Sequence, residues 1–419
     1  MYRFLMLMFC ISSVLTGSSQ NFVPNYDEEK VPDYQLPDIF TFENGEKVKT
    51  PADWQERRAE LLDLFAEHVY GHAPEWDGEI DITLLYENKK ALNGTTHMRE
   101  LKITLLKDNQ TLDIFLLLYL PLSNAGAPIF MGYNFYGNHT TTSDTSVKLN
   151  PHWIRNNQDF HINENRSTEA SRGVRNSRWP AKEIIQRGYG LATIYCGDLD
   201  PDYDDGFQNG VHQLMQTNTK DNTWGTIAAW SWGLSRLLDA LENNILEKEQ
   251  KVFVIGHSRL GKAALWAGAL DQRFDMVISN NSGCGGAALS RRQFGETVER
   301  INNNFPHWFA GNFKQYNKNE DQLPVDQHQL LAVVAPRPLY VASASEDLWA
   351  DPYGEFLSAK AASEIYEFMD LKGLPALKMP ETKQPLHGTI GYHIRSGKHN
   401  ITTYDWKQYM DFADKHFGK

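Results

Sequence analysis

The chain has 419 residues, of which 41% are hydrophobic and 22% are charged, so it can bury a large core and is not intrinsically disordered. Acidic residues outnumber basic ones by 53 to 41, which gives a formal net charge of −12 at pH 7. This balance argues against a nucleic-acid-binding protein, because such proteins carry a basic face. Three cysteines are too few for a disulfide framework or a four-cysteine zinc site.

Residues 1–20 have the pattern of a secretory signal peptide: one arginine, an apolar run over 4–11, and small polar residues before the end. A buried N-terminal strand and a lipoprotein modified at Cys10 are weaker interpretations. The apolar run is too short to anchor the chain in a bilayer. We therefore expect a secreted or periplasmic protein with no membrane anchor after cleavage, in which Cys196 and Cys284 either pair or stay free.

The first part of the mature chain, residues 21–125, predicts an N-terminal arm, one helix and the first strands of a sheet. Residues 21–45 are rich in proline and aspartate and show no period, which is typical of an extended arm. Residues 52–70 have helical spacing of apolar residues. Strand-like runs follow at 80–86, 97–106 and 112–120, and we expect the last two to be antiparallel neighbours.

From residue 128 onward, short apolar runs alternate with helical stretches. The expected strands are 128–135, 190–195, 251–255, 276–279, 338–343 and 376–379. The expected helices are 181–187, 227–241, 260–270 and 359–369. This alternation predicts a mostly parallel sheet with helices on both faces. We expect residues 126–419 to form the catalytic core of one α/β domain that includes the earlier strands.

The most informative segment is Gly256-His257-Ser258-Arg259-Leu260-Gly261, which follows an apolar strand and precedes an alanine- and leucine-rich helix. It is related to the Gly-x-Ser-x-Gly nucleophile elbow, with the second glycine three residues after the serine. In such an elbow a tight turn exposes the serine hydroxyl above the sheet. The context predicts an α/β-hydrolase, a three-layer sandwich with a mostly parallel sheet and an N-terminal antiparallel portion, in which Ser258 is the nucleophile.

A serine nucleophile needs a base and an orienting acid, which in this fold follow it in the order acid, then histidine. The turn after strand 338–343 offers Glu346, Asp347 and Asp351. We favour Asp347, because catalytic aspartates lie a few residues past this strand and Asp351 precedes a proline, as a helix cap does.

The catalytic histidine belongs in a late loop before the final helix, and residues 384–406 offer His387, His393 and His399. We favour His399, which lies just before that helix. We expect His393, its main rival, to be a structural histidine.

Several segments resemble carbohydrate esterase family fifteen, the glucuronoyl esterases, over nearly the whole mature chain. They are the Ser-Arg elbow, Asn134 to His139, Arg178 to Pro180, Gly197 to Asp202, Ser282 to Ala287, Asp347 to Pro352 and Gly397 to His399. The likeness is greatest to bacterial members. It implies hydrolysis of the ester between glucuronate, often 4-O-methylated, of glucuronoxylan and an alcohol of lignin, through a serine triad with no metal and no cofactor.

The resemblance also assigns roles to single residues. Ser258 matches the nucleophile and His399 the base, while Arg259 matches an arginine of the oxyanion hole. Lys262, Glu296 and Trp349 match residues that bind the uronate. A fixed cation beside a developing oxyanion stabilises it more than a neutral donor does.

One position departs from the fungal pattern. Fungal members carry a catalytic glutamate immediately before Ser282, where this chain has Asn281. The acid must then come from the other location, at Asp347, which some bacterial members use. The fungal disulfide beside the serine and histidine is also absent, because His257 and Asn400 stand in place of its cysteines.

Two other functions remain open. An acetyl-xylan esterase or other carbohydrate esterase would use the same triad, since a triad does not select the acyl group. A catalytically silent carbohydrate-binding protein would keep the pocket but lose a triad member. The acidic run from Asp198 to Asp205 does not fit a calcium loop, so we expect a structural loop and no metal there. We expect a monomer.

Overall fold

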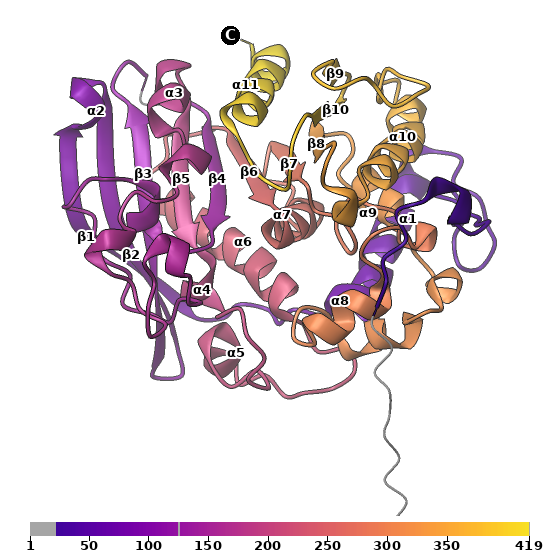
Figure 1. Cartoon of the computed structure of the whole chain (residues 1–419), viewed down its shortest axis with the longest axis horizontal. Helices are drawn as coiled ribbons and strands as arrows, with labels where there is room; N and C mark the ends of the chain where they lie inside the picture. Colours follow the sequence, from indigo (N-terminus) through magenta and orange to yellow (C-terminus); the bar gives the residue numbers. More distant parts are fainter. Residues whose placement is uncertain (1–21, 125, 419) are drawn as a thin grey trace, which may run out of the picture.

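The computed structural model describes residues 22–124 and 126–418, so the predicted signal peptide lies outside the described residues. Its centre is one mixed sheet of ten strands in the order β1-β2-β3-β5-β4-β6-β7-β8-β10-β9 (Figure 1). The strands are β1 (Glu79–Lys90), β2 (Thr96–Lys107), β3 (Gln110–Pro121), β4 (Ile129–Asn134), β5 (Gly190–Tyr195), β6 (Val252–His257), β7 (Met276–Asn280), β8 (Leu339–Ala344), β9 (Leu386–His387) and β10 (Ile390–Arg395).

The two parts of the sheet differ in strand direction. β1, β2 and β3 form an antiparallel meander, and β3 pairs antiparallel with β5. From β5 through β4, β6, β7 and β8 to β10 all neighbours are parallel, and only the short β9 reverses at the far edge. The predicted α/β-hydrolase sheet with an N-terminal antiparallel portion is therefore confirmed.

Helices cover both faces of the parallel part, which makes three layers (Figure 1). Alternate residues of each strand point to opposite faces, so Val252 and Val254 of β6 join one core and Phe253 and Ile255 the other. The helices are α1 (Pro51–Phe65), α2 (Ala91–Gly94), α3 (Ala181–Gln186), α4 (Cys196–Leu199), α5 (Gly210–Leu214), α6 (Thr226–Asn244), α7 (Arg259–Leu270), α8 (Val298–Asn304), α9 (Gln327–Ala332), α10 (Pro352–Phe368) and α11 (Thr403–Phe417). Side chains of α3 and α11 form the Phe253 core, and those of α1, α6, α7, α9 and α10 the other.

Two expectations for the C-terminal part are wrong. Residues 376–379 form neither strand nor helix, and the expected late loop begins as β9 and β10. β10 cannot be recognised from the pattern of hydrophobic residues, because it contains glycine, histidine and arginine. These polar residues are nevertheless buried, since His393 and Arg395 find partners inside the fold.

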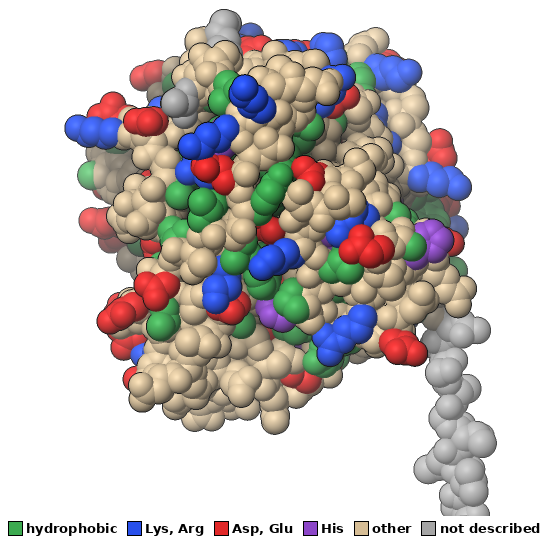
Figure 2. Space-filling view, turned by 90° about the vertical axis from the view of Figure 1, so that its left-hand side faces the viewer, with side chains coloured by type: hydrophobic (Ala, Val, Ile, Leu, Met, Phe, Trp, Pro, Cys, Tyr) green, Lys and Arg blue, Asp and Glu red, His purple; other side chains and the backbone are tan. Residues whose placement is uncertain are grey.

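The antiparallel edge of the sheet faces solvent. The exposed positions of β1 include Glu79, Asp81, Glu87, Lys89 and Lys90. Figure 2 looks onto this side of the molecule, where Lys and Arg side chains lie interspersed with Asp and Glu. Charged side chains on an edge strand oppose pairing with another chain. Within residues 22–124 and 126–418, no helix has the length and apolar character needed to cross a membrane.

Candidate active site

The nucleophile elbow lies between the parallel strand β6 and helix α7. Ser258 has φ 59° and ψ −131°, a conformation that is strained for a residue with a side chain. Its backbone N–H donates to the carbonyl of Asn280 on β7, 2.9 Å away, which holds the turn in place. A Cβ at Gly256 would lie 1.9 Å from the Leu260 carbonyl oxygen, so this close turn requires a glycine.

Asp347 lies in the turn after β8 and is buried. Its Oδ2 lies 2.6 Å from Nδ1 of His399, which comes from the loop between β10 and α11. The two rival acids lie elsewhere: Glu346 is exposed, and Asp351 caps α10 by accepting the Gly354 N–H at 2.9 Å. Asp347 is therefore the carboxylate of this turn that can orient His399.

Asn281 reaches the same carboxylate. Its side-chain amide donates to Oδ2 of Asp347 at 2.8 Å, so that oxygen contacts both Asn281 and His399. The position that carries a glutamate in the fungal pattern thus supports the carboxylate on the neighbouring loop. This contact is not predicted from the sequence, in which Asn281 stands out only because it lacks a charge.

His257 packs against the back of His399. The two rings lie 4.6 Å apart at 39°, and Nδ1 of His257 lies 2.6 Å from Oδ1 of Asn280. Burial lowers the pKa of His257 well below its usual value, so the ring that contacts His399 is neutral. Cys196 and Cys284 are both free and buried. Ring packing against His257 and the contact with Asp347 therefore hold the His399 imidazole.

Arg259, the first residue of α7, extends beside Ser258. Its guanidinium donates to Asp202 and lies over the rings of Phe135 and Trp308, with 5.1 Å and 5.3 Å to the centroids. Asp202 also lies 2.8 Å from Nε1 of Trp308 and 3.2 Å from Nε2 of His307. Burial alone would raise the pKa of Asp202, but Arg259 and the two donors lower it below its usual value.

Asp202 comes from the acidic run that sequence analysis interprets as a structural loop, and its contact with Arg259 is not predicted there. Neighbouring Asp198 does serve structure, since it accepts from the Phe115 N–H and from the Asn150 amide. In the described part of the chain, no group of three or more His, Cys, Asp or Glu residues could hold a metal ion.

Lys262 lies one turn after Ser258 and is buried. Its ammonium donates to the carbonyls of Ser282 and Cys284, each at 2.5 Å, which leaves one N–H for another acceptor. Burial lowers the pKa of Lys262, opposed by Glu296 nearby. Burial likewise raises the pKa of Glu296, opposed by Lys262 and by the Trp349 indole. The two groups, which influence each other's pKa, form a polar wall of the site.

One cavity of about 340 Å³ collects these side chains. Its lining includes all seven site residues predicted from the sequence: Ser258, Arg259, Lys262, Glu296, Asp347, Trp349 and His399. Phe305 and Trp308, whose rings stack 3.7 Å apart, also line it and are not predicted. The cavity combines an exposed hydroxyl, an imidazole backed by a carboxylate, an arginine and sugar-binding types of side chain.

An elbow serine on a parallel sheet, together with an acid and a histidine on later loops, defines the class of α/β-hydrolases. Comparisons with known proteins narrow this class. The sequence model of the family described as "Glucuronyl esterase, fungi" matches residues 202–370. Carbohydrate esterase MZ0003, from an unknown prokaryotic organism, is 47% identical over 397 residues, which cover 94% of this chain and 92% of the relative.

Solved structures point to the same family of proteins. A promiscuous CE15 esterase from a marine bacterial metagenome is 46% identical, covers 94% of this chain and 100% of its own, and superposes with a TM-score of 0.88. A glucuronoyl esterase from Solibacter usitatus is 42% identical with the same coverage and a TM-score of 0.86. The chain therefore belongs to carbohydrate esterase family 15, the glucuronoyl esterases of bacterial type, and is a carboxylic ester hydrolase.

Proposed function

We propose that this protein hydrolyses esters of glucuronic acid or 4-O-methyl-glucuronic acid, as found between xylan and lignin, through an acyl-enzyme on Ser258. The convergence of Ser258, the Asp347–His399 pair and the Lys262–Glu296 wall in one cavity carries this proposal. Relatives support the acyl group: the Cerrena unicolor protein called 4-O-methyl-glucuronoyl methylesterase is 28% identical over 84% of this chain and 64% of its own length.

In the first step, His399 takes the proton of the Ser258 hydroxyl as the oxygen attacks the ester carbonyl. Nδ1 of His399 faces Asp347 at 2.6 Å, so Nε2 is the nitrogen that serves as base. The carboxylate fixes this tautomer and stabilises the imidazolium that forms. His399 then returns the proton to the leaving alcohol, and a water molecule releases the uronate from Ser258 by the same route.

The negative charge on the carbonyl oxygen develops beside α7. The backbone N–H of Arg259 lies at the first position of this helix, where no intrahelical acceptor exists. The guanidinium of Arg259 adds a positive charge whose orientation Asp202 and the two aromatic rings fix. A preoriented donor and cation stabilise the transition state without reorganising as the reaction proceeds.

The uronate ring would lie between the polar wall and Trp349. The remaining N–H of Lys262 can donate to a ring hydroxyl and the Glu296 carboxylate can accept from one. Trp349, which is half-buried at the cavity, offers an indole face for the apolar side of a sugar.

A direct test compares hydrolysis of benzyl glucuronate with deacetylation of acetylated xylan. We expect activity on the first, and Ser258→Ala should abolish it while leaving the far-ultraviolet circular dichroism unchanged. Activity on acetylated xylan alone would refute the assignment of the acyl group. Retained esterase activity in Ser258→Ala would refute the nucleophile.

A broader ester specificity is the second candidate, because the relative with 46% identity is described as a promiscuous esterase. A panel of acetyl, feruloyl and uronoyl esters at equal concentration separates the two. A preference of less than about tenfold for uronoyl esters, or about 1.4 kcal/mol, would favour the broader function. We also propose cleavage of residues 1–20 on export and a monomeric mature enzyme.

A further inference from the structure

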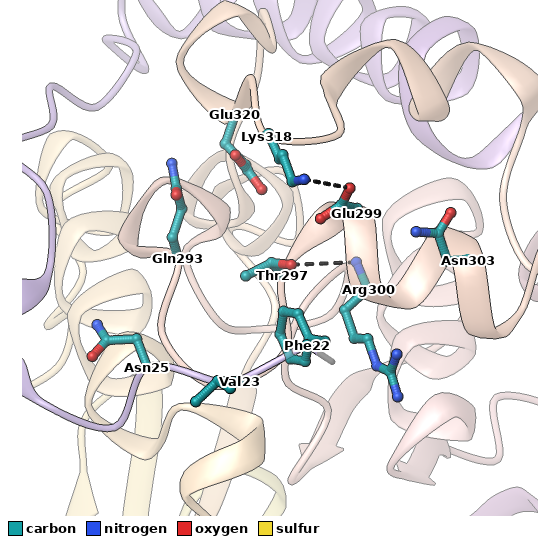
Figure 3. A pocket seen from close by; sticks show the side chains of 10 residues that line it. All are labelled: Phe22, Val23, Asn25, Gln293, Thr297, Glu299, Arg300, Asn303, Lys318 and Glu320. Carbon is teal, nitrogen blue, oxygen red and sulfur yellow. Dashed lines mark hydrogen bonds and ion pairs between the residues drawn. The ribbon is translucent and has the colours of Figure 1, made fainter. Parts of the chain in front are cut away.

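A second cavity, of about 720 Å³, lies beside the active site between the N-terminal arm and the segment around α8 (Figure 3). One wall is Phe22, whose ring meets the ring of Trp349 edge-on at 6.1 Å. The lining also includes Thr297, the residue after Glu296 of the active site. One aromatic pair and two consecutive residues therefore connect the linings of the two cavities.

The side chains around this second cavity are mostly polar. Only Phe22 and Val23 are apolar, and the other eight lining residues carry amide, hydroxyl or charged groups. Its charges balance, since two acidic residues face two basic ones, and Lys318 pairs with Glu299 at 3.0 Å. Balanced charge and many donors and acceptors suit a neutral ligand rich in hydroxyl groups.

Glu320 gives an independent indication of a ligand. Its side chain is 1% exposed, and neither carboxylate oxygen makes a hydrogen bond of normal geometry. Burial raises its pKa to about 7, although backbone N–H groups of Glu320 and Val298 lower it. Figure 3 shows the carboxylate directed toward Thr297, between Gln293 and Glu299. A buried carboxylate that has no hydrogen bond of normal geometry is costly, so it calls for a specific explanation.

We propose that this cavity is a subsite for neutral sugar units of the polysaccharide that carries the uronate, with Glu320 accepting from a sugar hydroxyl. The proposal rests on the proposed function, because the uronate must occupy the neighbouring cavity. Both Glu320 oxygens are buried at the cavity wall, so the carboxyl group would rotate about its soft terminal torsion to meet the ligand. Phe22 lines this cavity and packs against Trp349 of the neighbouring one, so it would contact the neutral sugar unit.

The test measures hydrolysis of two substrates that differ only in the polysaccharide part: benzyl glucuronate, and the benzyl ester of glucuronate linked to xylotriose. Two variants alter the second cavity alone. Glu320→Gln removes the charge of the buried acceptor, and Asn303→Trp, on an exposed position of α8, fills the space. Glu381→Gln, on an exposed loop, is the matched control for the first variant.

On the xylotriose ester, we expect both variants to lower kcat/KM on the order of tenfold through KM, the effect of losing a hydrogen bond to a charged group. On benzyl glucuronate, both should stay within about twofold of the parent enzyme, as should the control on either substrate. Equal effects on the two substrates, or none on the xylotriose ester, would overturn the proposal. A change only in the preference between methyl and benzyl glucuronate would instead place the alcohol in this cavity, and would also overturn it.

A binding experiment distinguishes a failure of the subsite proposal from a failure of the proposed function. Xylotriose is titrated calorimetrically into Ser258→Ala and into the same protein with Asn303→Trp added. We expect binding only to the first. Binding to both or to neither would overturn the subsite. Xylotriose binding in a parent enzyme that fails to hydrolyse benzyl glucuronate would leave the sugar subsite in place and overturn the proposed function.

Discussion

His399 and His393 come from the same segment near the C-terminus, and each pairs with an aspartate. His399 lies 2.6 Å from Asp347, and His393 lies 2.9 Å from Asp405. The difference is at the second ring nitrogen. His393 is completely buried, and its Nδ1 meets the Tyr340 hydroxyl at 3.0 Å, whereas the side chain of His399 is 40% exposed and lines the Ser258 cavity.

The arginines near the two histidine–aspartate pairs also differ in whether they are buried or face the cavity. Arg395 donates to Asp405 at 3.0 Å and is buried inside the fold. Arg259 lies at the cavity, and its partner Asp202 is a separate carboxylate from the one that holds the histidine. We infer that a histidine–aspartate pair can serve as a catalytic base where the histidine faces a cavity, whereas the buried pair, with both ring nitrogens occupied, holds the fold together.

Asp347→Asn should have the largest effect of these changes, lowering kcat by about 10²–10⁴-fold, since the amide neither fixes the tautomer nor stabilises the imidazolium. Steady-state kinetics on benzyl glucuronate measures it, with Glu346→Gln as the exposed control. A silent Asp347→Asn with an inactive Glu346→Gln would move the catalytic acid by one residue. Because Asn281 lies 2.8 Å from Asp347, Asn281→Glu added to Asp347→Asn should recover part of the rate.

Asp405→Asn should lower the free energy of unfolding rather than kcat. The Asp405 side chain is fully buried and accepts from His393, Arg395 and Thr402, so its loss leaves Arg395 without its carboxylate. Removing one partner of a buried ion pair costs about 3–5 kcal/mol. Urea denaturation measures this loss, and kcat of the folded enzyme should fall less than about tenfold. A large fall in kcat at unchanged stability would contradict the division of roles between the two pairs.

Arg259→Ala should lower kcat by about 10²–10³-fold with little change in KM, because the cation acts on a charge that exists only in the transition state. The same assay separates the two parameters. Asp202→Asn should lower kcat in the same direction by a smaller factor, since Arg259 remains but loses its orienting charge. An effect on KM alone would make Arg259 a substrate-binding residue.

Glu355 gives the most gradual effect, a pH dependence of stability. It is buried beneath the cavity and accepts from the backbone N–H groups of Ser282 and Gly283, and burial raises its pKa to about 8. The folded state therefore keeps a proton that the unfolded state loses, so stability falls as pH rises from about 4.5 to about 8, by at most about 1.4 kcal/mol per pH unit.

Urea denaturation across this pH range tests the effect. Glu355→Gln should flatten the slope, whereas the exposed Glu381→Gln should keep it. An unchanged slope in Glu355→Gln would assign the pH dependence to another group.

The site residues that can be predicted from the sequence are those whose positions depend on nearby parts of the chain. Ser258 follows from one strand–turn–helix segment, and Asp347 follows from its place after a buried strand. The roles of Arg259 and Lys262, on the same segment, come from the family resemblance. The partner of Arg259 could not be predicted, because Asp202 is 57 residues away in the chain and its acidic neighbours suggest a solvated loop. β10 was missed for a related reason: its histidine and arginine are buried only because Asp405 of α11 pairs with both.

The contact between Asn281 and Asp347 has an evolutionary consequence. The two side chains lie on different loops, yet Asn281 donates to the same Asp347 oxygen that contacts the His399 imidazole. A lineage could gain a carboxylate at one position while the other still served, and lose the older one later. The catalytic acid can thus change its place in the sequence without an inactive ancestor, and without moving the histidine that it serves.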